Sequence, residues 1–73
     1  MIDNRPANQI IYLIDEDGIT QYVKNRTVNK FSSVVETKLE LTTDRSQAKR
    51  FRIFEAVFIR NENQGTDLHY MSA

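Results

Sequence analysis

The chain has 73 residues, a formal net charge of zero and 40% hydrophobic residues. A chain of this length forms one domain and has no room for a second hydrophobic core. With 27% charged residues, two glycines and one proline, the composition excludes a disordered or collagen-like chain and is typical of a small globular domain. The longest strictly apolar run, Ile10 to Ile14, is far too short to span a membrane.

The sequence contains no cysteine, which favours a reducing compartment because small secreted domains usually depend on disulfides. The first nine residues contain no apolar stretch of the kind found in a signal peptide. We therefore expect a cytoplasmic protein that does not associate with a membrane.

The chain begins with a polar segment, residues 1–8, which we expect to be a flexible lead-in to a single domain at residues 9–73. "QIIYLID", residues 9–15, predicts a strand that is apolar on both faces and therefore covered on each side. "EDG" follows, and "ITQYVK" at residues 19–24 resumes the apolar pattern. An Asp-Gly pair between two apolar runs predicts a β-hairpin, because glycine tolerates the positive φ that a tight primed turn requires.

Residues 25–33, "NRTVNKFSS", have no clear period and are interpreted as a connection. The next stretch, residues 33–43, alternates strictly: Val35, Thr37, Leu39 and Leu41 fall on one face, and charged or polar residues fall on the other. This pattern predicts a half-buried strand with a solvated outer face.

A short helix is expected at residues 44–50, within "TDRSQAKRF". Asp44 followed three positions later by Gln47 resembles a capping box. Lys49 and Arg50 would lie in the last turn, where the helix dipole favours cations. Such a helix accounts for most of the local basic charge without any ligand.

The last third of the chain is ambiguous. Phe54, Val57 and Phe58 share a face at helical spacing, whereas the residues around Ile53 and Ile59 alternate and are dense in aromatic and β-branched types. We favour a second hairpin with "NENQG" as its loop, and keep a second helix at about residues 53–63 as the alternative. The expected fold is α+β and mostly β: an antiparallel sheet of about five short strands with one short helix near residues 44–50.

Few residues indicate catalysis or metal binding. The acidic run Asp15 to Asp17 invites a metal hypothesis, but the hairpin turn explains the same residues. His69, the single histidine, could pair with Asp67 two residues away on a strand, yet no serine is marked as an activated nucleophile. We expect no catalytic residue, no metal site and no cofactor, and hence not an enzyme.

Charge is distributed unevenly along the chain. Residues 24–60 hold nine Lys or Arg against four Asp or Glu, and the rest of the chain holds one against six. This asymmetry favours oriented binding to a charged partner. The candidate basic binding surface consists of Lys24, Arg26, Lys30, Arg45, Lys49, Arg50 and Arg52. The candidate acidic surface consists of Asp15, Glu16 and Asp17.

"IYLIDEDGITQYV" followed by "LTTDRSQAKRF" resembles a pattern in short, mostly uncharacterised phage and prophage proteins, in which a strand–turn–strand start precedes a T-x-D-x-x-x-A-K-x-F segment. The resemblance covers about half the chain, and its motif residues are structural: Gly18 for the turn, Asp44 for the cap, Ala48 and Phe51 for packing. It implies a protein that acts by binding one protein of the host cell.

We therefore expect a non-enzymatic interaction protein, derived from a phage, that binds and modulates or inhibits a host protein. The alternative is a small nucleic-acid-binding domain, because basic residues near Tyr22 and Phe31 combine charge with stacking surface. An exposed strand could also pair with its copy, so a homodimer is a further hypothesis.

Overall fold

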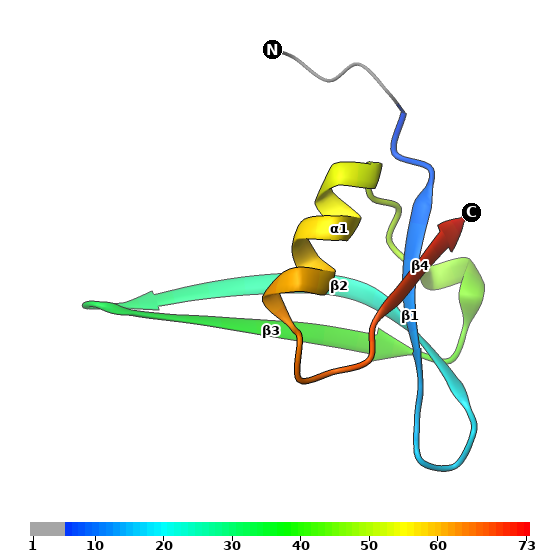
Figure 1. The fold of residues 1–73 in the computed structure, drawn as a ribbon, viewed down its shortest axis with the longest axis horizontal. Coiled ribbons are helices and arrows are strands. Elements are labelled where there is room, and N and C mark those ends of the chain that lie inside the picture. Colours follow the sequence, from blue (N-terminus) through cyan, green and yellow to red (C-terminus); the bar gives the residue numbers. More distant parts are fainter. Residues whose placement is uncertain (1–5) are drawn as a thin grey trace.

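The computed structural model describes residues 6–73. The elements in chain order are β1 (Gln9–Ile14), β2 (Thr20–Phe31), β3 (Val34–Thr42), the 3₁₀ helix η1 (Arg45–Gln47), α1 (Ile53–Glu62) and β4 (His69–Ser72). The strands form one antiparallel sheet in the order β3-β2-β1-β4, and α1 lies against one face of it (Figure 1). The α+β, mostly β fold is thus confirmed, with four strands in place of about five.

Residues 1–5 of the expected lead-in lie outside the described residues, and residues 6–8 precede β1 without regular structure. Within residues 6–73, no helix is long and apolar enough to cross a membrane.

β1 is covered on both faces, as its sequence predicts. Ile10 and Ile11 point to opposite sides of the strand, and their exposed fractions are 3% and 0%. Ile11 belongs to the core that α1 closes through Ala56 and Ile59. Ile10 faces the segment around η1 on the other side of the sheet.

The first predicted hairpin is confirmed. Asp15 and Ile19 close the loop through a backbone hydrogen bond of 3.0 Å, and the N–H of Gly18 donates to the carbonyl of Asp15 at 3.0 Å. Gly18 has a φ of +78°. Positive φ at the third of three loop residues is the arrangement of a three-residue hairpin, one residue longer than a primed two-residue turn.

The segment at residues 25–33 is not a connection. β2 continues to Phe31 and pairs with β3 residue by residue, from Asn25 opposite Glu40 to Phe31 opposite Val34. Ser32 and Ser33 form a two-residue turn in which Ser32 has a φ of +56°. The turn lacks the glycine or asparagine that announces such hairpins, and for that reason the sequence pattern hides it.

The β2–β3 ribbon extends away from the rest of the domain as a two-stranded arm (Figure 1). The radius of gyration is 12.9 Å, against about 11 Å for a compact chain of this length. From residue 25 to residue 40 no ribbon side chain is buried. Cross-strand pairs therefore hold most of this arm together, while the partly buried Leu39 packs against the core at its base.

A β-bulge at Lys24 sets which face of the ribbon meets α1. Val23 pairs with Leu41 and Asn25 pairs with Glu40, so Lys24 is an extra residue in β2. A regular strand through Lys24 would place Val23 and Asn25 on one face, whereas the bulge places Val23 and Arg26 there. Arg26 and the residues that alternate with it are thereby turned toward α1.

The helix expected at residues 44–50 is a single 3₁₀ turn. Asp44 is its N-cap, as predicted, and accepts from the backbone N–H of Ser46 at 2.9 Å. In a capping box the N–H of Asp44 would donate to the side chain of Gln47. Here this N–H donates to the hydroxyl of Thr42 at 3.1 Å instead. From residue 48 the chain extends instead, and the N–H of Lys49 donates to the carbonyl of Val23 at 3.0 Å.

The second hairpin that we favoured is wrong, and the alternative helix is correct: residues 53–62 form α1. Phe51 forms an isolated bridge with Gln9, which uses the part of β1 that β2 leaves unpaired, and the chain then turns into the helix. Glu55 accepts from the backbone N–H of Arg52 at 3.1 Å and its charge complements the helix dipole. Ala56 and Ile59 enter the core, and Leu68 closes it before β4.

Ser32→Gly should stabilise the protein by about 1 kcal/mol, because a left-handed φ is strained for serine and free for glycine. Urea unfolding followed by circular dichroism measures the change. Ser33→Gly is the matched control, since Ser33 has no positive φ and should lose roughly 0.5–1 kcal/mol. Equal unfolding midpoints for the two variants would contradict the turn geometry.

Ile11→Ala should cost roughly 2–5 kcal/mol of unfolding free energy through the cavity that it leaves. A small domain has only a few kcal/mol in total, so much of the population should unfold. Ile14→Ala, on the same strand but 59% exposed, should change stability by no more than about 0.5 kcal/mol. The dispersion of an amide NMR spectrum distinguishes the two results, and similar spectra would place the core elsewhere.

Candidate protein-binding surface

A hollow with a largely apolar lining lies between α1 and β2. Phe54 and Phe58 lie four residues apart on α1 and are 50% and 60% exposed. They border a cavity of about 300 Å³, which we call the helix–ribbon groove. Its lining residues are Arg26, Phe54, Glu55, Phe58 and Ile59.

Arg26 is held in place at one wall of the helix–ribbon groove. Its Nη2 lies 2.7 Å from Oε2 of Glu62 and 3.0 Å from Oε1, and its guanidinium carbon lies 5.8 Å from the ring centre of Phe58. The ion pair joins the ribbon to the end of α1, and the two side chains are about one-quarter exposed. An arginine fixed in this way presents its planar face without a large loss of side-chain entropy.

The ribbon continues the apolar surface beyond the helix–ribbon groove. Cross-strand partners point to the same face, so the pairs Arg26–Leu39, Val28–Thr37 and Lys30–Val35 follow one another along the α1 side. Val28 is 40% exposed and Val35 is 61% exposed. The groove therefore opens onto a strip of mixed apolar and basic character.

The structure divides the predicted basic surface between several places. Arg26 lines the groove, Lys30 lies on the same face of the ribbon, and Lys24 is the bulged residue. Lys49 covers the ring of Phe51 at 5.6 Å, and Arg52 precedes α1. The seven predicted residues therefore do not form one continuous patch.

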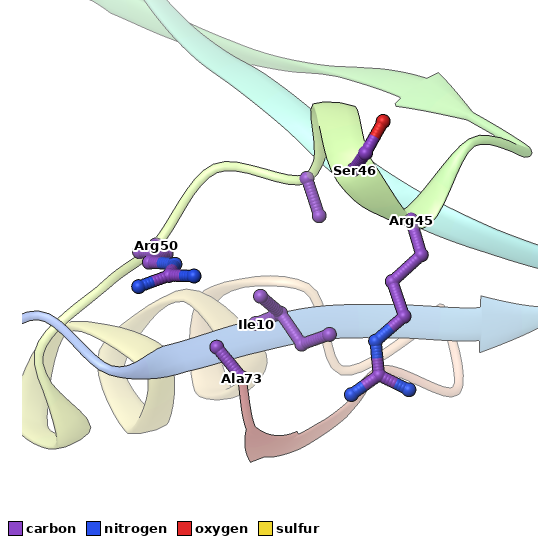
Figure 2. A pocket seen from close by; sticks show the side chains of 6 residues that line it. Ile10, Arg45, Ser46, Arg50 and Ala73 are labelled. Atoms are coloured by element: carbon purple, nitrogen blue, oxygen red, sulfur yellow. The ribbon is translucent and has the colours of Figure 1, made fainter.

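Arg45 and Arg50 lie on the opposite side of the sheet, around a second cavity of about 210 Å³. Ile10, Ser46, Ala48 and Ala73 complete its lining. Figure 2 shows the two guanidinium groups at opposite ends of this cavity, with Ile10 and Ala73 between them. The cavity is smaller than the helix–ribbon groove and has no aromatic lining residue.

The predicted acidic surface is part of the first hairpin turn. Oδ1 of Asp15 accepts from the N–H groups of Asp17 and Ile19, and Oδ2 accepts from the side chain of Gln21 at 3.1 Å. The bond from Gln21, followed by that from Ile19, holds the pKa of Asp15 below its usual value. Asp15 thus stabilises the turn, while Glu16 and Asp17 are exposed and do not line the groove.

The Asp67–His69 pair that the sequence allows is present, with Nε2 of His69 3.2 Å from Oδ2 of Asp67. The imidazole also stacks on Tyr12, with ring centres 5.4 Å apart. Tyr12 and its partner His69 lie on the face of the sheet opposite to Ile11, away from the helix–ribbon groove. In the described part of the chain, no group of three or more His, Cys, Asp or Glu side chains could hold a metal ion.

Sequence reasoning missed most of the helix–ribbon groove. Of its lining residues, only Arg26 was among the predicted site residues. The available signal was the spacing of Phe54, Phe58 and Glu62, which follow one another at intervals of four residues. This spacing places the three side chains side by side only if residues 53–63 form a helix.

No protein family, curated protein or solved structure matches the chain.

The Arg26–Glu62 pair should contribute roughly 0.5–1 kcal/mol, as expected for a bidentate but partly exposed ion pair. A double-mutant cycle with Arg26→Ala and Glu62→Ala, measured by urea unfolding, isolates this coupling energy. The coupling should fall as salt rises, because the pair is accessible to screening ions. A coupling of zero at low salt would show that the ribbon and α1 are energetically independent.

Proposed function

We propose that the protein is a non-enzymatic interaction domain that binds a segment of a partner protein in the helix–ribbon groove. The observation that carries this proposal is the pair of half-exposed phenylalanines, Phe54 and Phe58, beside an arginine that is already oriented. Adjacent exposed apolar side chains on a small domain mark interaction sites, and aromatic residues and arginine supply most binding hot spots.

The size and chemistry of the groove define the segment that fits. A volume of about 300 Å³ holds one or two side chains rather than a large ligand. The aromatic walls favour an apolar anchor such as leucine, methionine or an aromatic residue. Lys30 lies on the same face of the ribbon as Arg26, and it forms no ion pair with any residue in the described range. Its charge therefore favours a partner segment with an acidic residue near the apolar anchor.

As part of the same proposal, the partner is a protein of the host cell, and binding modulates or inhibits it. The support for this part is the resemblance of the hairpin and of the T-x-D-x-x-x-A-K-x-F segment to short phage proteins. Nucleic-acid binding is the weaker alternative, because the basic residues needed for it are divided between the two faces of the sheet.

The test is a selection of displayed random peptides on the purified protein, followed by NMR titration of the selected peptides. We expect peptides with an apolar anchor and a nearby acidic residue, and shift changes at Arg26, Phe54 and Phe58. Phe54→Ser with Phe58→Ser should weaken binding at least about tenfold, which is about 1.4 kcal/mol.

The matched control is Ile14→Ser with Ile19→Ser, which removes two side chains of similar exposure far from the groove. This control should bind the peptides like the parent protein. Equal loss in both double variants, or shift changes confined to other faces, would contradict the proposal. Binding of single-stranded DNA that collapses between about 50 and 200 mM salt would favour the nucleic-acid alternative instead.

A further inference from the structure

The outer edge of β3 has no neighbour within the described residues. β3 is the terminal strand of the sheet, and its nine residues contain no proline, no glycine and no bulge. Such a strand presents a row of unpaired backbone N–H and C=O groups that can accept another strand. The other terminal strand, β4, is only four residues long.

The side chains of β3 carry a charge pattern that reads the same in both directions. Glu36, Lys38 and Glu40 lie on the face away from the helix–ribbon groove, in the order negative, positive, negative. Within one molecule these charges interact only weakly. Nζ of Lys38 lies 3.9 Å from Oε1 of Glu36, and the two side chains are 66% and 49% exposed.

We infer that two copies of the chain pair through β3, antiparallel, with Thr37 opposite Thr37 of the second copy. Directly opposite residues of two antiparallel strands lie on the same face of the sheet, and a two-fold axis perpendicular to the sheet leaves each residue on its own face. Opposite residues therefore differ by an even number of positions, so the residue at the centre of the pairing lies opposite its own copy. In this register Lys38 lies opposite Glu36 of the second copy, and Leu39 lies opposite Val35 of the second copy. Both pairs occur twice, and each is of a type that stabilises neighbouring strands.

Neighbouring registers are less favourable. A register centred on Lys38 places lysine opposite lysine and Glu36 opposite Glu40, and like charges directly opposite destabilise a sheet. A register centred on Leu39 keeps an opposite-charge pair between Lys38 and Glu40 but moves the tip of the ribbon past the end of the partner strand. The Thr37 register instead brings Val34 and Val35, each 61% exposed, into the pairing.

The inference does not depend on the helix–ribbon groove, and its test needs only the purified protein. Sedimentation equilibrium should show a species of twice the 8.6 kDa chain mass as concentration rises from about 10 μM to 1 mM. Lys38→Glu should raise the dissociation constant at least about tenfold, because both Lys38–Glu36 pairs then become pairs of like charge. A monomer at every concentration would overturn the inference.

The charge exchange Glu36→Lys with Lys38→Glu tests the register. It restores opposite charges in the Thr37 register and should restore the parent dissociation constant. In the Leu39 register the exchange would place a negative charge at position 38 opposite Glu40 of the second copy, so failure to restore the dimer would overturn the Thr37 pairing. Circular dichroism confirms that each variant folds.

The absence of cysteine makes a direct check simple. Thr37→Cys should form a disulfide-linked dimer under mild oxidation, since directly opposite strand positions lie within the Cα separation that a disulfide accepts. Lys38→Cys should form it far more slowly. Faster linkage through Lys38→Cys, or through Leu39→Cys, would assign a different register and overturn this one.

Discussion

The rest of the structure depends on the burial of β1 from both sides. Ile10 and Ile11 are consecutive and buried on opposite faces, so β1 is enclosed like a strand in the middle of a much larger protein. Most of the domain attaches to it directly: β2 along its second half, Phe51 and β4 along its first half, α1 over one face and the segment around η1 over the other. β3 is joined to it only through β2. With so short a chain, this arrangement leaves few residues to cover the ribbon, and apolar ribbon side chains such as Val28 and Val35 stay exposed.

That distribution of apolar residues explains where binding surface is available. The core takes Ile11, Val23, Phe51, Ala56, Ile59 and Leu68, and the two largest side chains of α1 remain outside it. Phe54 and Phe58 therefore keep half or more of their surface open to solvent. A helix that is anchored by a small alanine and a single isoleucine exposes its aromatic residues without weakening the core, and a partner can then cover them.

Much of the first half of the fold could be predicted from the sequence because its signals are local, but residues 25–33 could not, since the turn at Ser32 carries no glycine or asparagine to mark it. Asp-Gly fixes the first hairpin, strict alternation fixes β3, and Asp44 marks a cap. The second half could not, because its determinants lie in tertiary contacts. Residues 53–62 alternate like a strand, but Ala56 fits only beneath a helix packed on β1, and Phe51 has already used the free edge of that strand. The same ambiguity hid the helix–ribbon groove, since its two phenylalanines adjoin only when the segment is helical.

The bulge at Lys24 has a consequence for how this surface could change over generations. Deletion of its single codon would leave Val23 opposite Leu41 and Asn25 opposite Glu40, now in regular alternation, so the same side chains would still face α1. What would disappear is the local bend and the extra twist that a bulge adds to its strand. The arm would then leave the domain in another direction and stand at another distance from the helix. A descendant of this gene could thereby reshape the groove in one mutational step while keeping every residue that lines it.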